Sequence, residues 1–442
     1  MVCGAAIYNR YPLVYSDTGA YLMSHNDGDR SIFYGLFILP ARVTHTLWSV
    51  VFAQSLLATY TLRLLSREVF AIKKNFEFLA IILLLCVTSS LPWYAGFLTP
   101  DIFTSLMILG LFMLAFSIRH LDLFDRFFVF ALTFLAAIVH YSHIPIATGL
   151  LIIALLVSLI RFERVRYLTT PAVVIVCAFV TIVASNYLTI GVASYSAGGY
   201  AFELGRLIED GPAVAYLREE CHRRSFRACS YLDQMPMSSS RFLWYTGYLR
   251  AGGFVGQSRE AAEIVKGTIE SYPAWVFKAA LIDTARQIRR SGTGGGLISY
   301  ADDHNPTRPL HSLYPSEFVS YLGSRQSRRQ LDMSAVQIVD YGVVIVSLLA
   351  CILAFIAALR SHDLLVLSFM LTIGLAILLH AFVTGAISEP INRYGARVIW
   401  LIPLTAIVSW HRALRHTKES LPPTVRPESH NAESQFPSTA TE

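Results

Sequence analysis

Long apolar stretches alternate with short polar connections along most of the 442-residue chain. A helix that crosses a membrane needs roughly 20 mostly apolar residues, and about nine stretches of that order occur here. The fourth and fifth of these stretches meet near Pro145, which predicts a tight helical hairpin with its corner just inside the membrane edge. The pattern predicts an all-α fold, a polytopic transmembrane helical bundle. The expected spans are 43–65, 77–92, 101–118, 127–141, 143–160, 171–190, 335–359, 363–386 and 396–411.

Composition supports a membrane protein. Hydrophobic residues make up 54% of the chain and charged residues 15%, and the mean hydropathy is +0.49. A soluble fold does not hide that much apolar surface. The net charge of +6 comes from the connections at one end of the spans, so nucleic-acid binding is not predicted.

The distribution of Lys and Arg predicts the orientation. Short cytoplasmic loops carry an excess of positive charge, and such loops occur here near 63–74, 119–126, 161–166, 360 and 412–418. The alternate connections then lie outside the cytoplasm. Five regions follow: a first extracytoplasmic loop (1–42), an N-terminal transmembrane module (43–190), an extracytoplasmic helical domain (191–334), a C-terminal transmembrane module (335–411) and a disordered cytoplasmic tail (412–442).

The N-terminus is expected outside, which requires the opening segment to cross the membrane unaided. Residues 1–7 are too short for a span or a signal peptide. We therefore expect the genomic region upstream of Met1 to encode an in-frame apolar stretch of about 20 residues.

The long outer segment, 191–334, has more charge, glycine and turn residues than its surroundings, and helical spacing of apolar residues predicts a mainly helical domain. An oxidising compartment would allow a disulfide between Cys221 and Cys229, but their spacing of eight leaves this open. Zinc binding by these cysteines and His222 lacks a fourth ligand with the usual spacing.

The first outer loop carries a carboxylate among aromatic and small residues. Asp17 is expected at the membrane surface, where partial desolvation raises the pKa of a carboxyl group and suits it to act as a general base. Its neighbours are candidates for substrate binding. The alternative is that Ser16 or Asp17 only caps a short helix and that the tyrosines belong to an aromatic belt. The candidate binding residues are Tyr15, Tyr21, Arg30 and Tyr34.

Two further candidates lie at outer corners of the bundle. Asp101 begins a span after Thr99 and Pro100, either as an ordinary helix entry or as a second acidic group facing Asp17. His140 and His143, three residues apart, are suited to hold a metal, orient a phosphate or move a proton. The alternative is a pair of interfacial histidines with their hydrogen bonds satisfied.

A fourth candidate precedes the last span, in the segment 388–397. Positive charge on the outer side departs from the local charge rule. Arg393, next to Tyr394, is placed to bind a lipid-borne phosphate with two hydrogen bonds. The alternative is an arginine that extends to the lipid headgroups.

Together these motifs resemble the GT-C superfamily of multi-span glycosyltransferases. The likeness rests on Tyr-Ser-Asp-Thr-Gly-Ala-Tyr at 15–21, Thr-Pro-Asp at 99–101, a long outer loop and Asn-Arg-Tyr at 392–394, and it covers roughly 11–190 and 335–411. The resemblance implies transfer of a sugar from a polyprenyl-phosphate carrier in the membrane lipid to an acceptor on the outer face. It makes Asp17 the catalytic carboxylate and Asp101 a second acidic group that positions acceptor or metal, while Arg393 holds the carrier phosphate.

The chain departs from this pattern at Thr18, where a second acidic residue often stands, so the resemblance leaves a divalent metal cofactor open and assigns no metal ligand. Two other functions are compatible with the sequence. A lipid or polysaccharide transporter would need polar or broken helices at mid-membrane depth, but the predicted spans carry almost no charge there, which counts against transport. A surface-polysaccharide polymerase or ligase would rely on outer-loop arginines instead of Asp17. The sequence identifies neither the sugar nor the acceptor nor a partner protein.

Overall fold

The computed structural model describes residues 1–160, 165–250, 252–301 and 305–419. The chain is all-helical, with 75% of residues in helices and no strand in these ranges. A single parallel bridge joins Leu13 to Phe97, which ties the first outer loop to the segment that precedes Asp101. The prediction of an all-α fold is confirmed.

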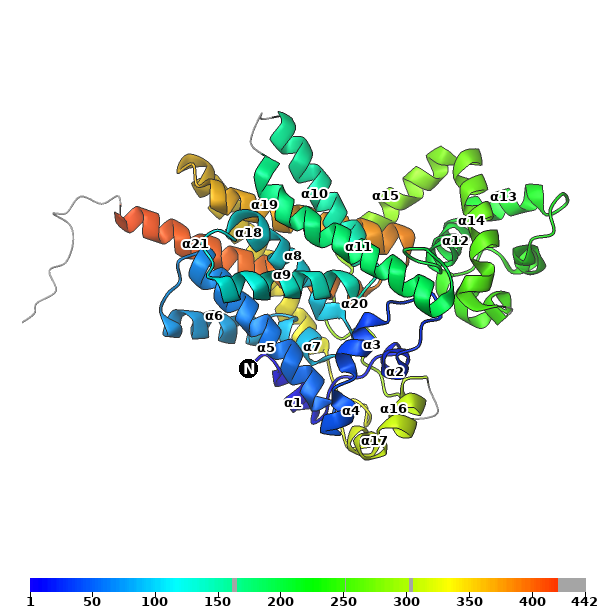
Figure 1. The fold of residues 1–442 in the computed structure, drawn as a ribbon, viewed down its shortest axis with the longest axis horizontal. Helices are drawn as coiled ribbons and strands as arrows, with labels where there is room; N and C mark the ends of the chain where they lie inside the picture. The colour runs from blue at the N-terminus through cyan, green and yellow to red at the C-terminus, as the bar shows by residue number, and fades with distance from the viewer. Residues whose placement is uncertain (161–164, 251, 302–304, 420–442) are drawn as a thin grey trace, which may run out of the picture.

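The N-terminal part holds four short helices followed by the long helices of the bundle (Figure 1). The helices are α1 (Gly4–Asn9), α2 (Thr18–Met23), α3 (Phe33–Ile38), α4 (Ala41–Thr44), α5 (Trp48–Leu64) with its extension η1 (Leu65–Val69), α6 (Asn75–Thr88), α7 (Leu91–Gly96), α8 (Asp101–Phe116), α9 (Leu123–Ile138), α10 (His143–Ile160), η2 (Val165–Leu168) and α11 (Thr169–Ile190).

The remainder comprises the outer segment and the C-terminal helices. The outer helices are α12 (Gly199–Asp210), α13 (Pro212–Glu220), η3 (Arg227–Gln234), η4 (Arg241–Tyr245), η5 (Tyr248–Arg250), α14 (Gly253–Ser271), α15 (Pro273–Arg289), α16 (Thr307–Leu313) and α17 (Pro315–Leu322). The C-terminal helices are α18 (Ser334–Arg360), α19 (Leu364–Ile387), α20 (Asn392–Ile399) and α21 (Leu401–Glu419).

Among the described residues, four helical segments are long and apolar enough to cross a membrane, which supports a membrane protein. They are His143–Ile160, Val165–Ile190, Ser334–Arg360 and Leu364–Ile387. Other predicted spans are shorter helices in the structure, among them α6 and α8. The last predicted span is divided at Trp400, because Pro403 supplies no backbone N–H to continue the helix through this point.

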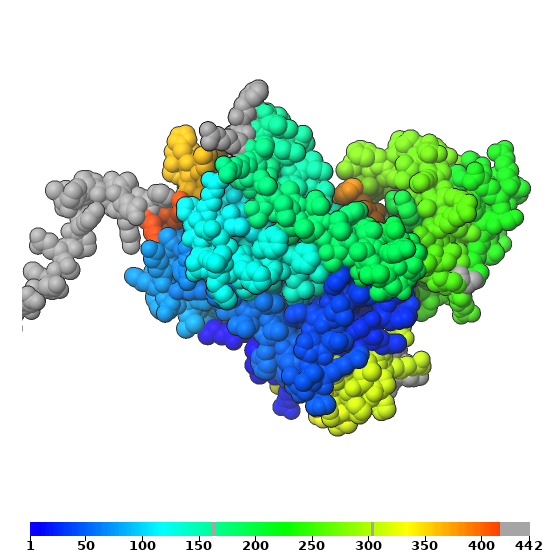
Figure 2. Space-filling view, viewed as in Figure 1, coloured from blue at the N-terminus to red at the C-terminus, as the bar shows by residue number. Residues whose placement is uncertain are grey.

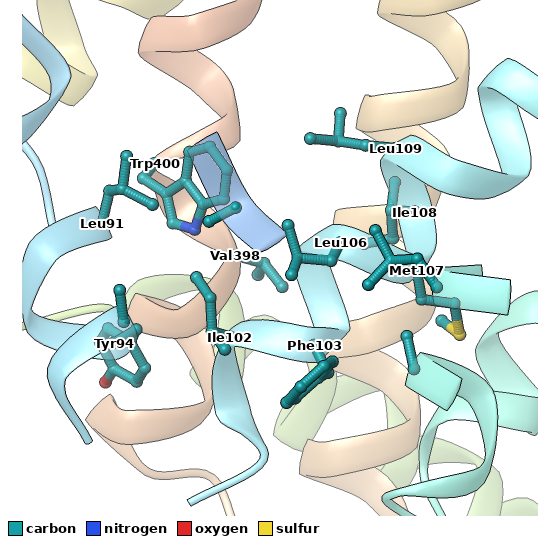
Figure 3. Packing of buried hydrophobic residues seen from close by; sticks show 14 of the residues in the cluster. Leu91, Tyr94, Ile102, Phe103, Leu106, Met107, Ile108, Leu109, Val398 and Trp400 are labelled. Carbon is teal, nitrogen blue, oxygen red and sulfur yellow. The ribbon is translucent and has the colours of Figure 1, made fainter. Parts of the chain in front are cut away.

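Helix α8 forms the centre of the bundle. Its residues from Asp101 to Leu114 are all buried, and it packs against α5, α9, α10, α11, α19 and α20. Apolar side chains of α8 meet Leu91 and Tyr94 of α7 and Val398 and Trp400 at the junction of α20 and α21 (Figure 3). A helix that is apolar on every face is stable only when enclosed in this way. Asp101, at its first residue, is therefore enclosed as well.

The basic connections meet at one end of the bundle. Arg67 pairs with Asp125 at 2.8 Å and Arg412 with Asp363 at 2.5 Å, and Arg415 donates to the backbone carbonyl of Ala71. This end, with the end of α21, points to the left in Figure 1. The predicted tail departs from expectation here, because α21 continues to Glu419 and these ion pairs hold it. The rest of the predicted tail, 420–442, and part of the basic loop 161–166 lie outside the described residues.

The outer segment, predicted as one domain over 191–334, contributes to two hydrophobic cores. Residues from Ala201 to Val265 share a core of their own, whereas Tyr300, Leu310 and Tyr321 belong to the core of the bundle. Helix α15 lies along α19, and α16 packs on α2. Amphipathic spacing predicted a mainly helical segment but could not predict which surface each helix would cover.

Two features place the outer segment around the first loop. Gln326 hydrogen-bonds both backbone groups of Val14, and Glu317 accepts from Tyr11 at 3.1 Å. On the opposite side, α12 and α15 contact α19. Figure 2 shows a hollow between these outer helices and the bundle, with the end of α19 visible in orange at its base. Both parts of the outer segment therefore border the region that holds Asp17 and Arg393.

Candidate functional site

Asp17 and Arg393 meet in space, as the sequence predicted. Asp17 directly precedes α2, and Arg393 lies in the first turn of α20. Nη1 of Arg393 lies 2.5 Å from Oδ2 of Asp17. Nη1 of Arg30 lies 3.7 Å from Oδ1 of the same carboxylate. The side chain of Asp17 keeps 34% of its exposure, whereas that of Arg393 keeps 5%. A partly accessible carboxylate thus stands between two guanidinium groups.

Asp101 is the buried anchor of this cluster. Its Oδ2 accepts from Nε of Arg393 at 2.9 Å and from the hydroxyl of Thr99 at 2.5 Å. Its Oδ1 accepts from Nη1 of Arg397 at 3.1 Å, and its side chain is fully buried. Both oxygens are occupied, so Asp101 acts through the arginines it orients. This differs from the expectation that Asp101 would itself contact an acceptor or a metal.

Arg397 is a site residue that the sequence interpretation did not assign. It is fully buried, donates from Nε to Nε2 of His380 at 2.9 Å and from Nη2 to Ser142 at 3.2 Å. Arg393 and Arg397 are four residues apart on α20, so they share a helix face. That spacing was a readable signal. His380, a histidine inside a predicted span, was another, since ionisable residues at such positions tend to be functional.

The electrostatics of Asp17 contradict one expectation. Burial alone raises the pKa of this carboxyl group, but the charges of Arg393 and Arg30 and the hydrogen bond from Arg393 outweigh it, and the pKa lies below its usual value. The prediction of a raised pKa took the desolvation of Asp17 into account but not the nearby arginines. Asp17 is therefore ionised at neutral pH and held in an ion pair.

Aromatic rings lie against each guanidinium. Arg393 lies 3.9 Å from the ring centroid of Tyr15, Arg397 lies 4.9 Å from that of Tyr394, and Arg30 lies 5.5 Å from that of Tyr21. Contacts of this kind favour the cation, increasingly so when it is desolvated. These tyrosines, predicted to bind substrate, are placed to fix the arginines.

Tyr34 does not belong to the accessible site. It is fully buried, its hydroxyl donates to Gln54 at 2.7 Å, and its ring stacks near Phe37. Tyr34 was predicted to bind substrate, but its position on α3 turns its side chain toward the core and away from the loop surface.

The two predicted histidines have different surroundings. His143 is fully buried; its Nδ1 faces the carbonyl of Ala136 at 2.5 Å, so it carries the proton, and its Nε2 accepts from Thr104 at 2.7 Å. His140, half-buried and stacked on His143, accepts at Nδ1 from the backbone N–H of Ser142. The neutral ring of His140 therefore carries its proton on Nε2, which has no hydrogen-bonding partner among the described residues. Only His140 has a donor to offer a ligand.

A glycine-rich loop of the outer segment holds α20 in place. A Cβ atom at Gly395 would lie 2.1 Å from the carbonyl oxygen of Arg290, and one at Gly295 would lie 3.1 Å from Cβ of Asn392. Gly292 donates its backbone N–H to Asn392 at 3.4 Å. Side chains at Gly395 would separate the loop from the helix, so glycine is needed for this close approach.

Metal-binding residues do not gather in the part of the chain that the structure describes: no group of three or more His, Cys, Asp or Glu side chains is placed to hold an ion. Cys221 and Cys229 form a disulfide, with their Cα atoms 5.8 Å apart. Their thiols are consequently not available to zinc. The alternative left open by the sequence is resolved in favour of the disulfide.

Comparisons with known proteins add no constraint. No protein-family model, no curated protein and no solved structure matches the chain. Asp17, Asp101, Arg393 and Arg397 form the cluster from which a function is inferred.

Proposed function

We propose that this protein is a membrane glycosyltransferase of the GT-C type, with nine spans and its site at the outer face of a bacterial cytoplasmic membrane. It would move a hexose or pentose from a polyprenyl-phosphate carrier to an acceptor. The ion pair between Asp17 and Arg393, 2.5 Å apart at the end of the bundle opposite the basic loops, is the observation that carries the proposal.

The pair supplies the two groups that the reaction needs. A carboxylate accepts the proton of the acceptor hydroxyl as its oxygen bonds to the anomeric carbon of the sugar. The bond from that carbon to the phosphate oxygen breaks, and the phosphate leaves with the electron pair. A guanidinium stabilises the developing negative charge. Asp17 takes the first role and Arg393 the second. A single displacement of this kind inverts the configuration at the anomeric carbon.

Binding of the donor would also prepare the base. Asp17 is a weak base while two arginines pair with it. A lipid phosphate that binds Arg393 competes with Asp17 for the same N–H groups. The ion pair then loosens, and the proton affinity of Asp17 increases only when the donor is in place. Asp101 stays paired and keeps Arg393 oriented throughout.

A polymerase or ligase of surface polysaccharide is the second candidate. The observation that favours it is the number of guanidiniums at the site, with Arg30, Arg393 and Arg397 all within one cluster. Such an enzyme would also act on lipid-linked sugars but would depend on the arginines more than on Asp17.

Transport is a third candidate, favoured by the buried ionic cluster of Asp101 and Arg397 with His380. The purified protein in liposomes separates it from transfer, because a transporter moves a labelled lipid-linked sugar across the bilayer without consuming it.

The deciding experiment compares wild type with Asp17→Asn and Arg30→Gln. Each is incubated with a panel of polyprenyl-phosphate-linked hexoses and pentoses and a membrane extract as acceptor, and release of polyprenyl phosphate is measured. The proposal expects loss of release in Asp17→Asn. Unchanged release in that variant with loss in Arg30→Gln would favour the polymerase or ligase.

A further inference from the structure

A large cavity opens at the end of the bundle opposite Asp17. It has a volume of about 1110 Å³ and lies among α8, α10, the start of α11, α18 and α19. Leu150, Ala154, Leu371 and Leu375 are among the apolar side chains that form its walls. Pockets of about 300–1,000 Å³ hold a drug-sized ligand, so this one has room for a large apolar group.

The mouth of the cavity is basic. Arg119, His120 and Arg166 line it, together with the hydroxyls of Tyr167 and Thr169. Arg119 and Arg166 are exposed, and neither guanidinium has an acidic partner among the described residues. No Asp or Glu belongs to the described lining. The cavity thus joins an apolar interior to a positive rim that has no acidic residue among its described lining residues.

Its position sets it apart from the candidate active site. Arg119 and Arg166 lie in the connections that the charge pattern places on the cytoplasmic side. The cavity ends near Ala147, one helical turn from His143 on α10. The cluster of Asp17 and Arg393 lines no part of it.

We propose that this cavity is a binding site for an anionic phospholipid of the cytoplasmic leaflet. The acyl chains occupy the apolar interior, and the phosphate and anionic headgroup bind Arg119 and Arg166. Basic pockets between membrane helices on the cytoplasmic side recognise such headgroups. Charge complementarity identifies the occupant, because a zwitterionic lipid brings its own cation to a rim that already holds Arg119 and Arg166, neither of which has an acidic partner among the described residues. The assignment does not depend on the proposed transfer reaction.

Native mass spectrometry of the full chain, released from detergent, tests the proposal. The protein is titrated with phosphatidylglycerol or with phosphatidylcholine of the same acyl chains. We expect the protein to retain phosphatidylglycerol at a concentration about tenfold lower than phosphatidylcholine. Each arginine near the surface contributes about fivefold to such an affinity, so Arg119→Gln with Arg166→Gln should reduce phosphatidylglycerol binding by roughly 25-fold.

Two further variants separate the headgroup from the chains. Ala154→Trp places a ring in the cavity and is expected to reduce binding of both lipids. Arg360→Gln, at the end of α18 and outside the cavity lining, is the matched control and is expected to leave binding within twofold.

Three results would overturn the proposal. Equal retention of the two lipids would remove the argument from charge. An unchanged affinity in the double arginine variant would show that the lipid binds elsewhere. Preferential capture of polyprenyl phosphate over phosphatidylglycerol, abolished by Ala154→Trp, would assign the cavity to a carrier lipid instead.

Discussion

Asp101 and Arg397 form an ion pair in which both side chains are fully buried, at a distance of 3.1 Å from Oδ1 to Nη1. Asp101 also pairs with Arg393, whose Nη2 lies 2.7 Å from Oδ2, so one carboxylate faces two guanidinium groups. Asp17 supplies the second negative charge. Two carboxylates thus balance two arginines of α20, and one of the carboxylates remains partly accessible.

Removal of Asp101 should destabilise the protein strongly. Breaking a buried ion pair by deleting one partner costs about 3–5 kcal/mol, because the other charge stays buried without compensation. Asp101→Ala leaves Arg397 in that state. Thermal unfolding in detergent should show a much lower midpoint for Asp101→Ala than for Asp17→Ala, whose side chain is partly exposed. Equal midpoints would argue against the anchoring role.

Asp17→Asn should abolish transfer while the fold is retained. Loss of a positioned general base typically reduces the rate by about 10²- to 10⁴-fold. The amide keeps the shape of the carboxylate, and Arg393 still pairs with Asp101, so the protein should remain folded, at a lower stability than wild type. Asp27→Asn, a nearby substitution of an exposed carboxylate, is the control and should retain full activity. A rate in Asp17→Asn within threefold of wild type would be incompatible with the mechanism.

The pKa of Asp17 predicts where stability depends on pH. Because the folded pKa lies below the ordinary value of about 3.9, this carboxylate stabilises the fold above that value. The contribution is lost as the pH falls through the lower, folded pKa. The difference in stability between wild type and Asp17→Asn should therefore be constant from pH 8 to about pH 5 and shrink only in stronger acid. Unfolding measured across this range tests it; a difference that disappears near pH 6 would contradict the lowered pKa.

The two histidines should respond differently to substitution. His143→Leu removes two hydrogen bonds and leaves Thr104 and the Ala136 carbonyl unsatisfied, which should cost about 1–3 kcal/mol of stability. His140→Leu removes the Nε2 donor, which has no partner among the described residues, and the acceptor of the half-buried Ser142, so it should cost less stability than His143→Leu. It should raise the KM for the lipid donor by about tenfold, as expected for one lost hydrogen bond to a charged group. Steady-state kinetics together with thermal unfolding separates a structural role of His143 from a binding role of His140. The same loss of stability and the same KM in both variants would refute this assignment.

Reduction of the Cys221–Cys229 disulfide should affect the unit formed by residues from Ala201 to Val265 alone. Closing so short a loop stabilises by about 2–3 kcal/mol in the chain-entropy account. Cys221→Ser with Cys229→Ser should increase proteolysis within this unit. Cys177→Ser, in α11, is the control and should leave cleavage unchanged. Cleavage that is equal in both variants would show that the disulfide adds no stability there.

The sequence predicted the meeting of Asp17 and Arg393 through sidedness, since alternating basic loops placed both residues at the same end. It also placed Asp101 and the histidines near them. It could not predict that α8 is enclosed on every side, which depends on packing among six helices and explains why Asp101 is inaccessible. The pKa of Asp17 was predicted in the wrong direction for the same reason, because it depends on tertiary contacts. The local sequence indicates desolvation, whereas the charges that lower the pKa come from Arg393 on α20 and from Arg30.

The contact of Gly395 with the Arg290 carbonyl has a mechanical consequence. The helix that carries Arg393 and Arg397 is fastened to the end of α15, and α15 runs beside α19, which carries His380. A displacement of α15 would therefore move α20, and with it Arg393 and Arg397. In the proposed reaction, an acceptor that binds the outer helices would thereby change how tightly Arg393 binds the phosphate of the lipid donor.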